Sequence, residues 1–102
     1  MIHVIASVRV KTGMLDPFLE LFKSTARQVR EEKGYIQYVP AVDAASGLPA
    51  QALDADVVTV IEKWESLEAL RNHLRTPHMV AFFEKRKGMV EEGSIVKVLQ
   101  EA

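Results

Sequence analysis

The chain of 102 residues lacks cysteine altogether, which excludes disulfide bonds and thiolate metal ligands. It also lacks an excess of charge, since 13 lysines and arginines oppose 14 aspartates and glutamates. A strong basic field that would attract nucleic acid or anionic lipid is therefore absent. No apolar run approaches the roughly 20 residues that span a bilayer. We expect no nucleic-acid partner and no membrane partner, and these absences favour a cytoplasmic protein.

Few residues interrupt regular structure, because the sequence has only five glycines and four prolines and no internal repeat. Its 48% hydrophobic and 26% charged residues are typical of a globular protein. Single cores are usually built from about 100 to 150 residues, so we predict one domain over residues 1–102. Residues 1–11 alternate without a leading basic region, which favours a first strand over a signal peptide.

Hydrophobic periodicity predicts the secondary structure. Alternation with a period of two predicts four strands, at residues 2–10, 35–42, 56–65 and 94–100. Apolar residues spaced three and four apart predict a helix between Leu15 and Gly34. A second helix is predicted to begin after Ser66, to break at Thr76 and to end near Gly88.

The order β-α-β-β-α-β predicts an α+β fold of the ferredoxin-like, split βαβ type with a four-stranded antiparallel sheet. Pro40 lacks an N–H group, so the later half of the second strand is expected at a sheet edge or in a bulge. Residues 43–55 are small, polar and interrupted by glycine and proline, and we predict a long loop of the kind that is usually functional or mobile.

Two helices cover only one face of such a sheet, yet both faces of the first and third strands carry aliphatic residues. An uncovered apolar face is a partner site, and we expect a homodimer with sheet packed on sheet, a dimeric α/β barrel. We assign Val4 and Val8 to this interface and Ile5 to the helix side. A lysine at Val4 or Val8 is then expected to break the dimer.

Glu62 and Trp64 share one face of the predicted third strand with Val58 and Val60. Trp64 is either a core indole or one wall of a slot that binds an aromatic molecule, and these two interpretations are compatible. An ionised carboxylate between apolar neighbours must be paired or shifted in pKa. Glu62 is therefore a candidate catalytic residue, with pairing to His73 or Arg71 as the structural alternative.

His73 follows on the short helix and is the favoured general base. The hydroxyl of a quinol has a pKa near 10, so a base with a pKa near 6.5 raises its ionised fraction. The structural alternative is a hydrogen-bonded core histidine. His78 lies in the first turn of the next helix, where the helix N-terminus disfavours its cationic form, and ranks below His73.

Other candidates carry less information. The two histidines are five residues apart and do not form the i, i+4 pair of a zinc-binding helix, so we expect no metal site. Ser7 on the first strand is a candidate pocket residue, as is its neighbour Arg9. The basic run at residues 85–87 is interpreted as a solvated helix end.

Three segments resemble the antibiotic biosynthesis monooxygenase family over residues 1–100: Glu62-Lys63-Trp64, Glu68-Ala69-Leu70, and His73-x-x-Thr76-Pro77-His78. Within that family, residues 38–47 and the pair Lys87-Gly88 are similar to the bacterial quinol monooxygenases. The resemblance implies a dimeric ferredoxin-like enzyme that uses dioxygen on an electron-rich aromatic substrate without flavin, haem or metal.

The resemblance also bears on further residues. In haem-degrading members, the haem-binding histidine and the asparagine and tryptophan that assist it correspond to positions near Phe83, Ser7 and His73. Phe83 cannot ligate haem iron, because its side chain has no ligating atom. We therefore expect no haem and no other cofactor, and assign Trp64, Ser7, His78 and Phe83 to substrate binding. Two alternatives remain, because a fold does not settle activity. One is a small-metabolite isomerase or hydratase that uses the same histidine. The other is a non-catalytic dimeric module that binds an aromatic molecule.

Overall fold

The structure, a computed structural model, describes residues 1–102 and has the predicted order of elements, with the second helix broken in two. The elements are β1 (Ile2–Arg9), α1 (Leu15–Val29), β2 (Tyr35–Val42), β3 (Val57–Trp64), α2 (Leu67–Arg75), α3 (Pro77–Lys85), the short 3-10 turn η1 (Arg86–Gly88) and β4 (Ile95–Gln100). This confirms the α+β, ferredoxin-like fold.

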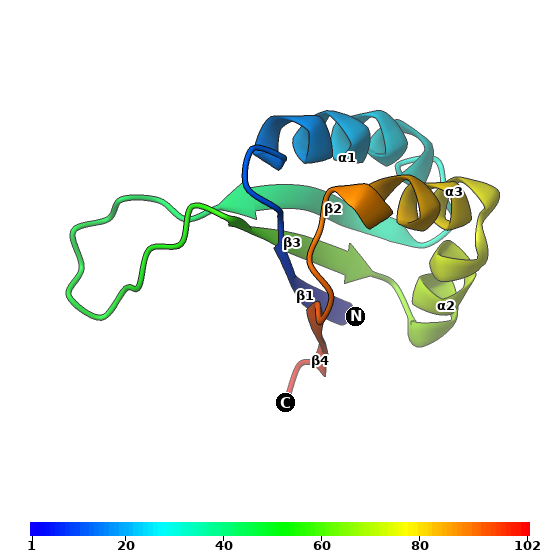
Figure 1. Ribbon diagram of the computed structural model, residues 1–102. Coiled ribbons are helices and arrows are strands. Elements are labelled where there is room, and N and C mark those ends of the chain that lie inside the picture. Colours follow the sequence, from blue (N-terminus) through cyan, green and yellow to red (C-terminus); the bar gives the residue numbers. More distant parts are fainter.

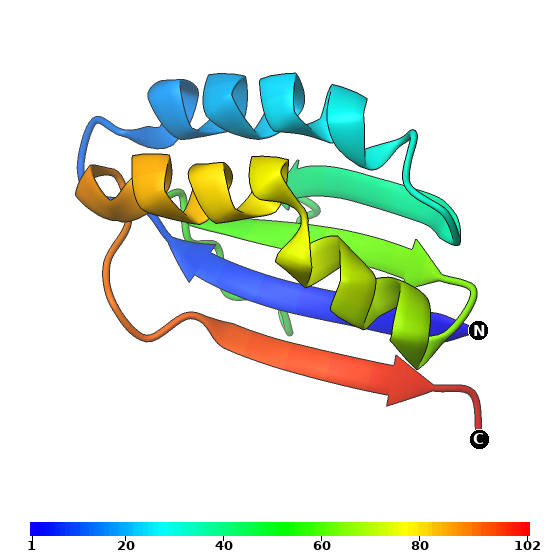
Figure 2. The ribbon, with the colours of Figure 1, turned by 90° about the vertical axis from the view of Figure 1, so that its right-hand side faces the viewer.

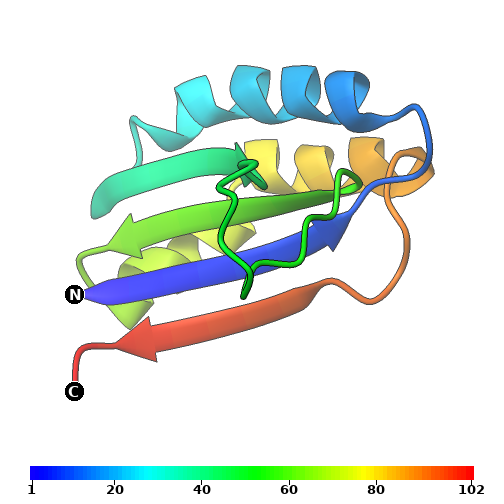
Figure 3. The same ribbon diagram turned by 90° about the vertical axis from the view of Figure 1, so that its left-hand side faces the viewer.

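The four strands form one antiparallel sheet in the order β2-β3-β1-β4. All three helices lie on one face of it (Figures 1 and 2), and the opposite face carries no helix (Figure 3). Pro40 lies on the edge strand β2, as predicted, although the irregularity in the register falls between Tyr35 and Gln37 instead.

The break between α2 and α3 has a local cause. Pro77 drives the preceding residue into extended backbone, and Thr76 has φ −64° and ψ 147°. The Thr76 hydroxyl accepts a hydrogen bond from the N–H of Met79 and so caps α3. Ser66 caps α2 in the same way through the N–H of Ala69. The two helices therefore meet at an angle, and His73 and Met79 on either side of their junction are buried.

Gly34 brings the turn after α1 against α2. Its φ of +86° favours glycine, and a Cβ there would lie 2.5 Å from the Cβ of Ala69. No side chain fits between the two segments. This close approach places the α1–β2 turn, residues 30–34, beside the junction of α2 and α3.

The helix-covered face of β1 is the one that carries Val4 and Val8, each 2% exposed. They pack with the aromatic core of α1, α3 and β2, which includes Phe18, Phe22, Phe82 and Tyr38. The assignment of Val4 and Val8 to an open interface is therefore wrong. The uniformly apolar face of β1 lies under the helices, because it buries more apolar surface there than the mixed face would.

Ile5 lies on the opposite, helix-free face, between Ile61 of β3 and Lys97 of β4. We call this face the open face. Its other apolar members include Val39, Ala41, Val57, Ile95 and Leu99. An aliphatic surface without helices is thus present, as expected, but with the opposite parity in β1.

Residues 43–56 contain no helix or strand and project away from the sheet (Figure 1), which confirms the predicted loop. Its two ends are joined, because the N–H of Asp54 donates to the carboxylate of Asp43 at 2.9 Å. Asp54 also forms an ion pair of 2.6 Å with Arg9 on β1. None of the helices is both long and apolar enough to cross a membrane.

Candidate active site

A cavity of about 170 Å³ lies between the helices and the covered face of the sheet. Fourteen of its 18 lining residues are hydrophobic, among them five aromatic residues. The aromatic residues are Phe18, Phe22, Tyr38, Phe82 and Phe83. An engineered apolar cavity of about 150 Å³ binds benzene, so this volume fits one aromatic ring. Glu62, His73, Arg86 and Ser94 supply most of the polar groups in its wall.

His73 projects from α2 into this wall, and its side chain is 1% exposed. Its Nδ1 lies 2.9 Å and 3.0 Å from the two carboxylate oxygens of Glu32, which only accept, so Nδ1–H donates. Its Nε2 lies 4.0 Å from Oε1 of Glu62. Burial lowers the pKa of His73, while Glu32 opposes this effect. The imidazole is therefore neutral at neutral pH, and Nε2 is the nitrogen left to accept a proton.

Glu62 lies on β3 between Val4 of β1 and Tyr38 of β2, on the covered face of the sheet. Its Oε1 accepts a hydrogen bond of 2.9 Å from Nε1–H of Trp64. Burial raises its pKa to about 7, against the effect of the bond from Trp64, and Glu32 raises it further. The carboxyl group is thus protonated in a large fraction of molecules near neutral pH. The predicted pairing with Arg71 does not occur, because Arg71 is exposed and forms no ion pair with Glu62.

Trp64 is fully buried and lies behind Glu62, outside the lining of the cavity. Its ring packs against His73, with ring centres 4.5 Å apart, and edge-on against Tyr35. Trp64 therefore does not form a wall of this cavity, and its assignment to substrate binding stays a prediction. The indole holds the two polar residues of the site from behind, by packing on one and donating to the other.

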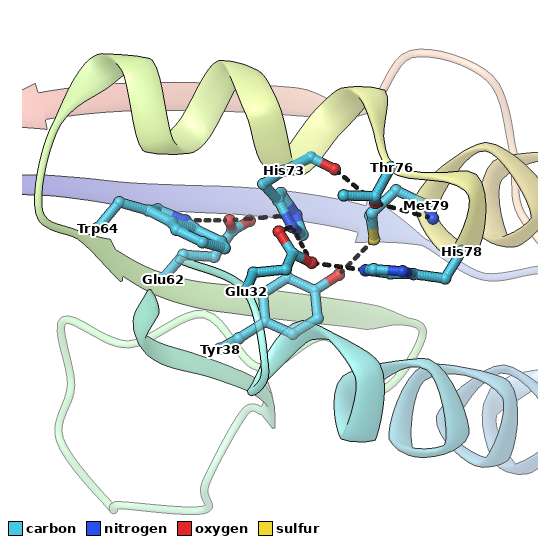
Figure 4. A network of polar contacts seen from close by, with 8 residues as sticks. All are labelled: Glu32, Tyr38, Glu62, Trp64, His73, Thr76, His78 and Met79. Atoms are coloured by element: carbon cyan, nitrogen blue, oxygen red, sulfur yellow. Dashed lines mark hydrogen bonds and ion pairs between the residues drawn. The ribbon is translucent and has the colours of Figure 1, made fainter. Parts of the chain in front are cut away.

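Glu32 joins both histidines (Figure 4). It lies in the α1–β2 turn, and its Oε2 is 2.6 Å from Nε2 of His78 while Oε1 is bound by His73. His78 is half-buried in the first turn of α3 and does not line the cavity. The structure thus brings His73 and Glu62 together at the cavity, with Trp64 behind them. His78 lies farther from the cavity, on the other side of the Glu32 carboxylate.

Arg86 and Phe83 form the cavity wall near β4. The guanidinium of Arg86 lies 4.7 Å from the ring centre of Phe83 and 5.8 Å from that of Phe82. It forms no ion pair, and burial lowers its pKa. An unpaired cation beside an apolar cavity attracts an anionic group on a ligand. Phe83 thus lies where a substrate-binding residue is expected, and Arg86 is not part of a fully solvated basic end.

Ser7 does not join the site. It pairs with Thr59 and Ile95 on the open face, so the sheet separates it from the cavity. The helices cover the face of β1 that carries Val4 and Val8, so Ser7 faces away from this cavity, and its assignment to substrate binding stays a prediction.

Sequence reasoning missed Glu32, Tyr38 and Arg86. Glu32 stands in a charged helix end, and its contacts with His73 and His78 span 41 and 46 residues, so no spacing signals them. Tyr38 lies on the covered face of β2, opposite Glu62 of β3. The alternation of side chains along the second strand could have indicated that the two residues share a face. Burial raises the pKa of Tyr38, with Glu62 and Glu32 adding to the effect, so its hydroxyl stays protonated. No group of three or more His, Asp or Glu residues is arranged to hold a metal.

The family described as antibiotic biosynthesis monooxygenase matches residues 1–85. The chain is 39% identical over 102 residues to the probable quinol monooxygenase YgiN of Escherichia coli (strain K12). The aligned region covers 98% of this chain and 97% of that protein. The protein of the same name from Shigella flexneri is equally similar.

Solved structures share the fold. A conserved protein from Methanosarcina mazei Go1 superposes with a TM-score of 0.86 at 21% identity, over 99% of this chain and 92% of that one. A structure described as an antibiotic biosynthesis monooxygenase gives 0.83 at 22% identity, over 100% and 99%. The solved structures show the fold, while the family match and the relative at 39% identity support a monooxygenase-type enzyme. The chain belongs to the antibiotic biosynthesis monooxygenase family.

Proposed function

We propose that the protein is a cofactor-independent monooxygenase that oxidises a quinol or another polyhydroxylated aromatic with dioxygen. The observation that carries the proposal is the position of His73, whose Nε2 has no hydrogen-bond partner and lies in the wall of a mostly apolar cavity lined by aromatic rings. The similarity to the probable quinol monooxygenase YgiN favours a quinol as the substrate class.

Proton transfer to His73 begins the reaction. A quinol hydroxyl, with an ordinary pKa near 10, gives its proton to Nε2. Arg86, the unpaired cation in the same cavity wall, attracts the resulting anion. A protonated Glu62 adds no negative charge near it, whereas an ionised Glu62 repels it.

Dioxygen then reacts with the anion. The quinolate gives one electron to dioxygen, and the two radicals couple to form a bond between oxygen and a ring carbon. The resulting ring-bound peroxide anion takes the proton back from His73 and becomes a hydroperoxide. The O–O bond breaks as the ring carbon loses its hydrogen, so that water leaves and a carbonyl remains, which tautomerises to a hydroxyl group. Quinol and dioxygen thus give hydroxyquinone and water, with all four electrons supplied by the substrate.

The test is oxygen uptake with a benzoquinol, whose single ring fits the cavity, with the spontaneous rate subtracted. We expect enzyme-dependent uptake of one dioxygen per hydroxyquinone formed, identified by mass spectrometry with labelled dioxygen. Binding without uptake contradicts the proposal and favours a binding module. Turnover of a small dicarbonyl compound without oxygen favours an isomerase, because His73 and Glu62 can also exchange protons between two carbons.

We further propose that the protein acts as a homodimer through the open face. Ile5 lies at its centre, between Ile61 and Lys97, so a lysine at Ile5 places an unpaired charge in the contact. We expect Ile5→Lys to weaken self-association on the order of 10²-fold or more, measured by sedimentation equilibrium.

Leu48→Lys makes the same chemical change in the 43–56 loop, where Leu48 is 67% exposed, and serves as the matched control. It should leave the dimer intact. Val4→Lys, by contrast, should destabilise the monomer, since Val4 is buried beneath the helices. A wild-type protein that sediments as a monomer, or an Ile5→Lys variant that dimerises as the wild type does, contradicts the assigned face.

A further inference from the structure

The carboxylate of Glu32 is held between two imidazoles, in an arrangement that neither a solvated side chain nor a simple helix cap requires. Its side chain is 10% exposed, and both of its oxygens are engaged, by His73 Nδ1 at 2.9 Å and 3.0 Å and by His78 Nε2 at 2.6 Å. Three elements that are distant in sequence meet at this carboxylate: the α1–β2 turn, the end of α2 and the start of α3.

We propose that Glu32 is the positioning residue of the proposed oxidation, which holds His73 in the Nδ1–H form so that Nε2 faces the cavity as the base. His78 is the second donor to Glu32 and fixes the carboxylate in place. This inference rests on the proposed function for its catalytic consequence, although the state of the His73 ring can be measured without any substrate.

The two ring nitrogens of His73 have different surroundings, which determine the nitrogen that carries the hydrogen. Nδ1 faces a carboxylate, which can only accept, while Nε2 faces the cavity and the more distant Glu62 at 4.0 Å. A neutral imidazole carries one hydrogen, and Glu32 stabilises the tautomer that carries it on Nδ1. A carboxylate on the far nitrogen also stabilises the imidazolium that forms when Nε2 takes a proton.

His73 separates two spaces. It lines the apolar cavity on one side, and on the other it lines a polar surface pocket together with Glu32, Asn72 and Thr76. Glu32 lies only in the polar pocket and so never contacts a substrate in the cavity. It is therefore a positioning residue and acts through His73.

The titratable groups that face His73 come from all the elements packed around it. They are Glu32 on the α1–β2 turn, Tyr38 on β2, Glu62 on β3 and His78 on α3. Burial lowers the pKa of His73, and Glu32 raises it. Loss of the charge on Glu32 therefore lowers the pKa further, and the neutral ring persists to lower pH.

Two variants separate the two parts of the role. Glu32→Leu removes the acceptor, and Glu32→Gln removes the charge but keeps an oxygen that can accept a hydrogen bond. Glu31→Gln removes a charge from the neighbouring exposed residue and is the matched control. All three are compared with the wild type by nitrogen NMR of the histidine rings without substrate, with His3→Gln used to assign the third ring.

In the wild type we expect His73 to carry its proton on Nδ1 once the ring is neutral. Glu32→Leu should lose this preference, Glu32→Gln should lower the pKa of His73, and Glu31→Gln should do neither. In oxygen uptake, both Glu32 variants should lower kcat by roughly 10²-fold or more with a smaller change in KM, as loss of the carboxylate of a triad does. The acid limb of the Glu32→Gln pH profile should move to lower pH.

A wild-type His73 protonated on Nε2, or Glu32 variants that leave both tautomer and pKa unchanged, would overturn the positioning role whatever the activity. Full kcat in a folded Glu32→Leu variant would overturn it as well. If the wild type oxidises no quinol while the NMR results are as expected, the proposed function fails and the positioning of His73 by Glu32 stands.

Discussion

Replacement of His73 by alanine is expected to lower kcat for quinol oxidation by roughly 10²- to 10⁴-fold, because the quinol hydroxyl then has no base beside it. Nε2 of His73 is the nitrogen in the cavity wall that is free to accept a proton, while Nδ1 is bound to Glu32. The measurement is oxygen uptake under saturating quinol, after circular dichroism and thermal unfolding have shown that the variant is folded.

Two further measurements separate lost chemistry from lost structure. His73→Ala leaves a hole beside Glu32, which free imidazole can enter, so added imidazole should restore part of the rate. His73→Gln fills the same space without a basic nitrogen and should be inactive with or without imidazole. A folded His73→Ala variant that retains the wild-type rate contradicts the assignment and makes Glu62 the next candidate.

The fold could be predicted from the sequence because its signals are local. Period-two strands, the spacing of Phe18 and Phe22, and the caps at Ser66 and Thr76 each depend on residues within a few positions. The element order then selects the fold. The prediction of the open face of β1 was wrong because it depends on tertiary packing. Alternation shows that β1 has two different faces, but not which of them the helices cover.

The site could be predicted only in part, for a similar reason. His73 and Glu62 stood out because polar groups among apolar neighbours require a partner or a shifted pKa. The partner of His73 could not be predicted, because Glu32 reaches it only when Gly34 folds the α1–β2 turn against Ala69. Trp64 was correctly expected to be buried, but an indole in a core and one in a pocket wall have the same sequence signal.

The burial of Glu62 in an apolar wall is expected to lower the free energy of unfolding at pH values where the carboxyl group would otherwise ionise. The folded-state pKa of Glu62 is about 7, and burial is the main cause of its rise from the ordinary value of 4.5. Below the ordinary value the carboxyl group is protonated in both states. As pH rises toward 7, the unfolded chain releases the proton and the folded chain retains it, so the free energy of unfolding falls. Above the folded-state pKa the loss is complete and constant.

Glu62→Gln removes this titration and keeps an oxygen that accepts the bond from Nε1–H of Trp64. The difference between 4.5 and about 7 corresponds to about 3 kcal/mol at most, so the variant should gain up to that amount on the wild type as pH rises across this range. Urea unfolding of both proteins at the two ends of the range measures it. Glu65→Gln, at an exposed carboxylate just after β3, controls for the loss of one charge and should show no such gain. A difference between wild type and Glu62→Gln that stays constant with pH would show that Glu62 is ionised in the folded protein, and the protonated Glu62 of the proposed reaction would then have to be abandoned.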